Sequence, residues 1–179
     1  WRKPNVCGGA FNQSLLAEAA SFGSTAMVQL LLDHGAQLEW PADGNGRTPL
    51  FTALSFSHHD VAELLLARGA RLDVATYGNQ SALHQLASSI ATPAQYRPER
   101  EVKLAEHMLY SGMPINAQDS LPMSNKTPLM LAVIHDKPQL ARYLIARGAD
   151  LDLQDAKGQT AADLARKLKR TAMLPMLTR

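Results

Sequence analysis

The sequence predicts an all-α repeat solenoid, built from helix-turn-helix units that are joined by short β-turn fingers. Two phrases recur along its 179 residues. One is an apolar run that closes on Gly-Ala, and it ends at Gly35 and again 34 residues later at Gly69. The other is Thr-Pro-Leu or a variant of it, which begins at Thr48, Ser81, Thr127 and Thr160. A unit of this length holds two short helices and buries their apolar faces only by stacking on its neighbours.

A 33-residue unit that opens near Thr-Pro-Leu-His and closes on Leu-Leu-x-x-Gly-Ala resembles the ankyrin repeat. The resemblance extends over about residues 12–174, nearly the whole chain. It implies an ankyrin stack of five repeats, for which we expect the bounds 12–42, 43–75, 76–118, 119–153 and 154–179.

Proline and glycine predict where the helices begin and end. Thr48 and Thr127 each precede a proline, so their hydroxyl groups can cap a helix whose first residue is that proline. Glycine follows the apolar segments, where it can adopt the left-handed conformation that ends a helix. These glycines are Gly35, Gly69, Gly112 and Gly148. Short alternating segments such as 70–74 predict one arm of each finger.

Some units depart from the pattern. Residues 1–11 predict an irregular N-terminal cap, with an incomplete earlier repeat as the alternative. Gly69 and Gly112 are 43 residues apart, about ten more than one repeat, and the extra residues fall at 91–100. Because two prolines interrupt this stretch, we expect a surface loop there and a helix that starts near Glu99. The finger at 119–126 is longer than the others, and Pro175 is expected to shorten the last helix.

The charge pattern argues against a nucleic-acid binder. Residues 1–153 contain 12 Lys and Arg against 14 Asp and Glu, whereas residues 154–179 contain 6 against 2. The chain therefore lacks a continuous basic face. The basic residues of the last unit favour a solvated cap helix over a site for nucleic acid or anionic lipid. They are Arg166, Lys167, Lys169 and Arg170.

Chemical motifs are scarce. The sequence contains no GxxxxGK[ST], GxGxxG or HExxH motif. His58 and His84 match positions where the resemblance implies structural hydrogen bonds, and the six histidines occupy scattered repeat positions. Ser88 lacks the context of a nucleophile, and Cys7 has no second thiol with which to pair. We therefore predict that the chain is not an enzyme and that it holds no metal and no cofactor.

The resemblance implies that a concave face, made of the fingers and the ends of the first helices, binds other proteins. Phe22 and Phe56 share one register at the helix ends, with packing into the stack as an equal alternative. Trp40 and Tyr77 are expected to be exposed on fingers, and the insertion adds a second candidate contact. The predicted partner-binding residues are Trp40, Asn45, Arg47, Tyr77, Gln80, Phe22, Phe56, Ser88, Ser89, Met123, Lys126, His135, Tyr96 and Arg97.

The predicted function is a non-enzymatic protein-protein interaction module that acts as a scaffold or adaptor. One alternative is a stand-alone inhibitor, such as a bacterial immunity protein that neutralises a toxic enzyme. Another is an accessory protein that docks on anionic membrane through its basic C-terminal cap. We expect a monomer that binds a protein partner and no nucleic acid. Because the sequence begins with Trp1, we expect a preceding segment; a signal peptide there would place the protein in the periplasm and its absence in the cytoplasm.

Overall fold

Five helix pairs follow one another in the computed structural model, which describes residues 7–8, 13–40, 46–74, 76–92 and 96–178. The first helices of the pairs are α1 (Leu15–Ser21), α3 (Pro49–Ser55), α5 (Ala82–Ser88), α7 (Pro128–Ile134) and α9 (Ala161–Lys167). The second helices are α2 (Thr25–Asp33), α4 (His59–Ala67), α6 (Pro98–Tyr110), α8 (Pro138–Ala146) and α10 (Leu174–Leu177). Two 3-10 turns, η1 (Tyr77–Asn79) and η2 (Thr171–Met173), and the strands β1 (Cys7–Gly8) and β2 (Gln13–Ser14) complete the elements.

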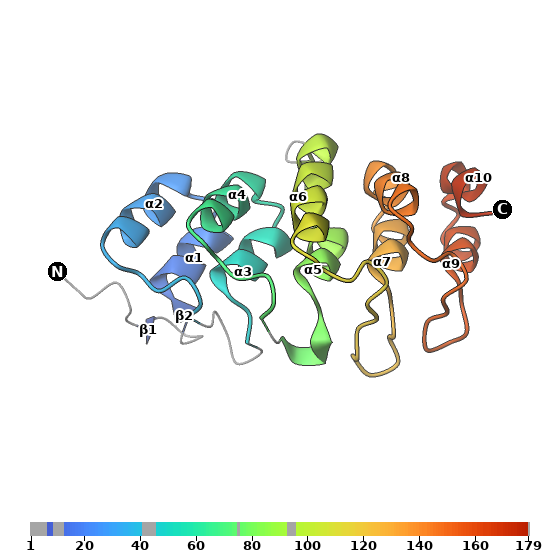
Figure 1. Ribbon diagram of the computed structural model, residues 1–179, viewed down its shortest axis with the longest axis horizontal. Coiled ribbons are helices and arrows are strands. Elements are labelled where there is room, and N and C mark those ends of the chain that lie inside the picture. Colours follow the sequence, from blue (N-terminus) through green and yellow to red (C-terminus); the bar gives the residue numbers. More distant parts are fainter. Residues whose placement is uncertain (1–6, 9–12, 41–45, 75, 93–95, 179) are drawn as a thin grey trace. The chain divides into compact units, whose positions relative to one another are not determined.

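The chain divides into an N-terminal unit, Trp1–Tyr77, and a C-terminal unit, Gly78–Arg179. In the N-terminal unit, α1 lies beside α3 and α2 lies beside α4, so that the helices form two layers (Figure 1). Small buried residues such as Ala20 and Ala53 let the first helices approach closely. The strands β1 and β2 pair antiparallel, with Cys7 opposite Ser14.

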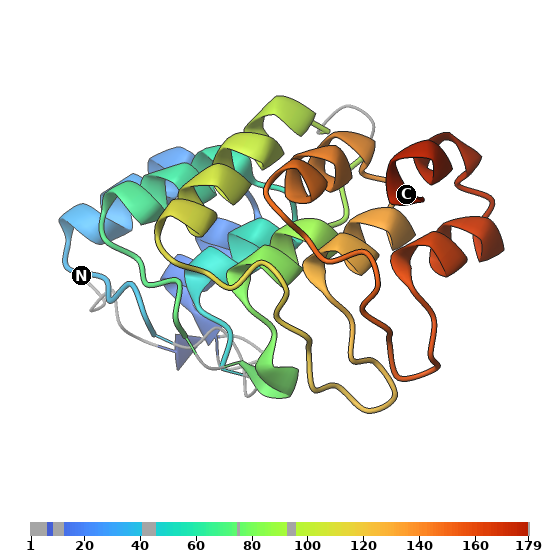
Figure 2. The ribbon, with the colours of Figure 1, turned by 45° about the vertical axis from the view of Figure 1, so that its right-hand side comes forward.

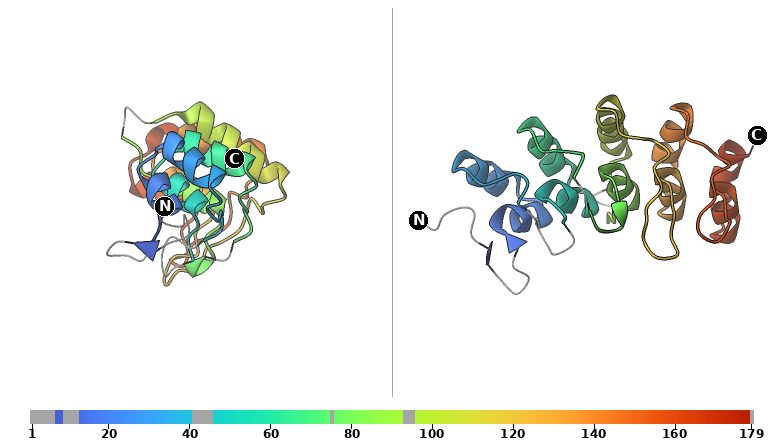
Figure 3. Two further views of the ribbon diagram at one scale, coloured as in Figure 1. Left: turned by 90° about the vertical axis from the view of Figure 1, so that its left-hand side faces the viewer. Right: turned by 60° about the horizontal axis from the view of Figure 1, so that its bottom comes forward.

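The C-terminal unit repeats this arrangement. One layer is formed by α5, α7 and α9, and α6 lies beside α8 in the other (Figure 2). The fingers that precede α7 and α9 project side by side from the helices (Figure 3). They are joined by hydrogen bonds from Gln118 Nε2 to the Gln154 carbonyl oxygen, 2.9 Å, and from the Ala156 amide to the Ser124 carbonyl oxygen, 3.0 Å.

The predicted helix caps are confirmed with one exception. Thr127 accepts a hydrogen bond from the Met130 amide at 3.2 Å, as its position before a proline predicts. Thr48 occupies the same place before α3, but its hydroxyl makes no capping hydrogen bond, so this part of the prediction is wrong. The left-handed helix ends are present, and Gly69 and Gly148 both have φ near 91°.

The helices of the third and fifth repeats, which depart from the regular pattern, begin and end close to where the sequence predicts. In the third repeat α6 begins at Pro98, next to the start expected at Glu99, and it is the longest helix that the structure describes. The last pair ends in the four-residue α10, which contains Pro175. Most of the expected N-terminal cap, residues 1–11, lies outside the described residues.

Candidate partner-binding surfaces

Phe22 and Phe56 are presented to solvent at the same position of two successive repeats. Each follows the last residue of a first helix, Phe22 after α1 and Phe56 after α3. Their exposed fractions are 76% and 51%, so neither side chain packs into the stack. Of the two interpretations that the sequence left open, the structure favours the surface one.

His58 holds these two turns together. Its Nε2 donates to the Ser21 carbonyl oxygen at 2.9 Å, which confirms the predicted structural role of this histidine. Its ring also lies against Gly23, where a Cβ atom would stand 2.5 Å from Nδ1. The Phe56 ring stacks with the His58 ring at a centroid distance of 6.3 Å and an interplanar angle of 28°. We call Phe22, Phe56 and His58 the turn cluster.

In the N-terminal unit, the finger with Trp40 and Arg47 leads into the start of α3, whereas the turn cluster lies at the ends of α1 and α3. A seven-residue helix such as α1 is about 10 Å long, so the two groups are separated by that length. Trp40 is half-buried, so it is less exposed than expected, and it lines a hollow together with Leu38 and with Arg71 of the next finger. Arg47 is half-buried, and Asn45 lies outside the described residues.

Two finger residues are highly exposed. Tyr77, at the end of the N-terminal unit, is 62% exposed, and Met123 is 76% exposed. Met123 stands on a loop that Asp119 closes, since its carboxylate accepts from the Ser124 hydroxyl at 2.9 Å and from the Lys126 amide at 3.1 Å. Gln80 and Lys126 are half-buried.

Ser89 is not available to a partner, which corrects its prediction as a contact residue. It is buried, its hydroxyl donates to the Leu86 carbonyl oxygen at 3.0 Å, and it accepts from Lys137 Nζ at 2.6 Å. Ser88 is half-buried. His135 is exposed after α7, and partial burial together with the charges of Lys137 and Arg170 lowers its pKa.

The two candidates on the insertion differ in accessibility. Tyr96 is half-buried against α8, with its hydroxyl 3.5 Å from Gln139 Oε1. This burial, reinforced by the charge of Glu101, raises the pKa of Tyr96 to about 12. Arg97 is exposed and donates from Nη1 to the Tyr96 carbonyl oxygen at 3.0 Å.

A buried ion pair in the third and fourth repeats was missed by sequence reasoning. Lys137 Nζ lies 2.7 Å from Glu101 Oε1, and the side chains are 4% and 0% exposed. Nζ also donates to the Leu86 carbonyl oxygen at 2.8 Å. Burial raises the pKa of Glu101 and lowers the pKa of Lys137, and the pairing opposes both shifts. The available signal was that Lys137, like His58, directly precedes a second helix.

His84 has the structural role that its repeat position implies. Its Nδ1 accepts from the Ser81 amide at 3.2 Å and its Nε2 donates to the Lys126 carbonyl oxygen at 3.1 Å. Burial lowers the pKa of His84, because a neutral ring is favoured in this environment. Among the described residues, no three His, Cys, Asp or Glu side chains gather in a way that could hold a metal ion.

Two basic residues of the fifth repeat form ion pairs with nearby carboxylates. Arg166 pairs with Asp163 at 2.8 Å, and Arg170 pairs with Asp136 at 2.9 Å. In the part of the chain that the structure describes, the helices are too short or too polar to cross a membrane.

Known families match both units. Two models described as ankyrin repeats match residues 2–76 and 113–165, on either side of the repeat that carries the insertion. A Danio rerio protein with a palmitoyltransferase name (ZDHHC13) is 28% identical over 96% of this chain and 25% of its own length. The ankyrin repeat domain-containing protein SAT10 of Stachybotrys chartarum is 32% identical over 84% of this chain and 7% of its own length.

A third relative is the transient receptor potential cation channel subfamily A member 1 homolog of Caenorhabditis elegans. It is 26% identical over 86% of this chain and 12% of its own length. The chain thus spans a quarter or less of each of these three relatives. The repeated phrases, the stacked helix pairs and the two family matches agree, and the chain belongs to the ankyrin repeat family.

Proposed function

We propose that this chain binds a protein partner without catalysing a reaction, and that the turn cluster is the centre of its binding surface. Ankyrin repeats are generally protein-protein interaction modules. The observation that carries the proposal is the exposure of Phe22 and Phe56, 76% and 51%, at one register of adjacent repeats.

The energetics of the turn cluster favour binding. Burying an aromatic side chain at an interface removes a large apolar area from water, and such residues are frequent among binding hot spots. His58 ties the two turns together, so a partner would not have to order them first.

The buried ion pair of Lys137 and Glu101 does not form an accessible reactive site. Lys137 and Glu101 are buried, and each is the other's ion-pair partner. A substrate would have no access to them without unfolding of the turn. This supports a binding role over a catalytic one.

A scaffold or adaptor role fits the comparisons better than a stand-alone inhibitor. The relatives carry the matched repeats as a quarter or less of much longer chains. Docking on anionic membrane through the fifth repeat has weaker support, because Arg166 and Arg170 already pair with carboxylates.

The test compares affinity capture by the wild type with capture by the double variant Phe22→Ala/Phe56→Ala, using quantitative mass spectrometry. We expect one or a few proteins to be lost from the variant. The matched control is Met27→Ala/Leu30→Ala, which removes two half-exposed apolar side chains from α2 of the same unit. Partners retained by the first variant, or lost equally with the control, would contradict the proposed surface. The identity of the captured protein would decide between a scaffold and an inhibitor.

A further inference from the structure

One contact between second helices differs between the two units. In the N-terminal unit Arg68, directly after α4, pairs with Asp33 at the end of α2, at 3.0 Å. In the C-terminal unit Arg147 directly follows α8, and the last residue of the preceding second helix, α6, is Tyr110. The arginine is thus retained, while the carboxylate that it meets in the other unit is replaced by an aromatic ring.

Two tyrosine rings hold Arg147 in place. Its guanidinium carbon lies 5.0 Å from the centroid of the Tyr110 ring and 5.4 Å from that of Tyr143. Its Nε donates to the Tyr143 hydroxyl at 3.0 Å. The nearest carboxylate is that of Glu106, whose Oε1 is 3.8 Å from Nη2, at the long end of ion-pair distances. The contacts with Tyr110 and Tyr143 raise the pKa of Arg147, so it remains charged.

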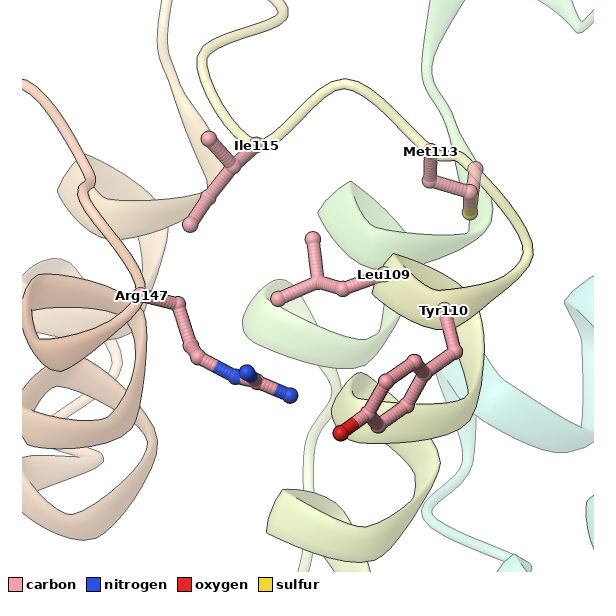
Figure 4. A pocket seen from close by; sticks show the side chains of 5 residues that line it. All are labelled: Leu109, Tyr110, Met113, Ile115 and Arg147. Atoms are coloured by element: carbon pink, nitrogen blue, oxygen red, sulfur yellow. The ribbon is translucent and has the colours of Figure 1, made fainter.

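An open pocket with a mixed apolar and polar lining lies beside this arginine. It has a volume of about 340 Å³ and is lined by Leu109, Tyr110, Met113, Ile115 and Arg147. Figure 4 shows the Arg147 side chain reaching toward the Tyr110 ring, with Leu109 beside this pair and with Ile115 and Met113 along the segment that follows α6. Met113 follows Gly112 in the third repeat, whereas the first, second and fourth repeats have a buried alanine after the corresponding glycine, namely Ala36, Ala70 and Ala149. The third repeat therefore departs from its neighbours at two positions that line the pocket.

We propose that this pocket, which we call the Arg147 pocket, binds a segment of a partner polypeptide in which an acidic side chain stands next to apolar ones. An apolar side chain of that segment contacts Leu109, Met113 and Ile115. Its carboxylate pairs with Arg147 in the way that Asp33 pairs with Arg68. The volume suits one or two side chains, which matches a short segment.

Charge complementarity is the reason for choosing an acidic occupant. A guanidinium group binds a carboxylate through two parallel donors, and because Nε of Arg147 already donates to the Tyr143 hydroxyl, Nη1 and Nη2 are the two donors for an incoming carboxylate. Glu106 competes for the same cation from half-exposed surface, at a distance that a second carboxylate can easily improve on. The pocket lies in the C-terminal unit and the turn cluster in the N-terminal unit, so a result that contradicts one of the two proposals leaves the other untouched.

The test uses the full chain and the blocked peptide acetyl-Leu-Glu-Phe-Asp-Leu-amide, followed by NMR of the side-chain methyl groups. We expect the peptide to shift the signals of Leu109, Met113 and Ile115. The matched peptide acetyl-Leu-Gln-Phe-Asn-Leu-amide has the same shape without the carboxylates, and we expect it to bind about fivefold more weakly, as for an exposed ion pair.

Three variants make the assignment specific. Arg147→Gln should abolish the difference between the two peptides, whereas Glu106→Gln should tighten binding of the acidic one. Arg68→Gln, the same substitution at the equivalent position of the other unit, should leave both affinities unchanged. Equal binding of the two peptides, a preference that survives Arg147→Gln, shifts confined to other residues, or no binding of the acidic peptide would each overturn the proposal.

Discussion

The turn between the two helices of a repeat is tied to the preceding repeat in both units, but the chemistry of the tie differs. Before α4 the tying residue is His58, whose Nε2 reaches the Ser21 carbonyl oxygen at 2.9 Å. Before α8 it is Lys137, whose Nζ reaches the Leu86 carbonyl oxygen at 2.8 Å. The lysine brings a charge into the interior, and Glu101 from α6 supplies the counter-ion.

The second helices show the same kind of difference. Arg68 meets a carboxylate of the preceding repeat, whereas Arg147 meets two tyrosine rings. A repeat position therefore determines where a side chain stands, and the residue opposite it in the neighbouring repeat determines what that side chain does. In this chain both exceptions involve α6, the helix that follows the insertion.

The largest effect is expected from breaking the buried pair. Lys137→Met removes the cation 2.7 Å from the buried Glu101 carboxylate, together with the hydrogen bonds to Leu86 and Ser89. Loss of one partner from a buried ion pair costs ~3–5 kcal/mol, so the free energy of unfolding in urea should fall by that amount.

The double variant Lys137→Met/Glu101→Leu provides the control. It removes both charges, and we expect it to be clearly more stable than Lys137→Met, because apolar residues replace buried pairs at little cost. If the single and double variants were equally destabilised, the pairing with Glu101 would not be what stabilises this turn.

The histidine tie of the N-terminal unit should be weaker and can be tested without changing His58 itself. Gly23 has φ +71°, and a Cβ there would collide with the His58 ring. Gly23→Ala should cost ~2 kcal/mol, about half from the left-handed backbone and half from the displaced hydrogen bond. Gly69→Ala is matched in backbone conformation, at φ +91°, but its Cβ would meet no atom within 4 Å. Equal losses in the two variants, measured by urea denaturation, would mean that the His58 contact contributes nothing.

Local signals predicted the repeat well because they act over a few residues. The prolines mark the starts of α3 and α7, and the glycines end the second helices with positive φ. The exposure of a side chain was harder to predict where its surroundings come from another repeat. The sequence could not say that Phe22 would be exposed, since an aromatic residue at a helix end packs equally well in either place.

The buried pair shows why the prediction for Ser89 failed. Ser89 was predicted at the surface from its position in the repeat, but it is buried and its hydroxyl accepts a hydrogen bond from Lys137 Nζ. This arrangement requires Glu101, which lies in α6 directly after the insertion, and Lys137, which lies 36 residues further along the chain. No local pattern links two residues at that separation when the repeat length itself is altered.

The pH dependence of unfolding tests the contribution of the buried His84 ring to the stability of the C-terminal unit. The folded protein favours neutral His84, because burial lowers the pKa of the ring below its ordinary value of 6.5. As the pH falls through that value, the unfolded chain takes up a proton that the folded chain does not, so stability is lost toward acid. His84→Gln keeps an acceptor for the helix cap and removes this titration. Its free energy of unfolding should depend less on pH between pH 7 and pH 5 than that of the wild type. Parallel pH profiles for the two proteins would contradict this role for His84.

The smallest effect on stability, and the sharpest test of the comparison between the units, comes from making the C-terminal unit resemble the N-terminal one. Tyr110→Asp places a carboxylate at the position that Asp33 occupies opposite Arg68. Tyr110 is 74% exposed, so we expect no measurable change in the urea midpoint. Arg147 would then have an internal partner, and binding of the acidic peptide should weaken to the level of its amide counterpart. The reciprocal variant Asp33→Tyr removes the carboxylate that Arg68 now contacts, and its stability should likewise be little changed. If Tyr110→Asp bound the acidic peptide as tightly as the wild type, the replacement of an internal carboxylate by a ring would not be what leaves Arg147 open to a partner.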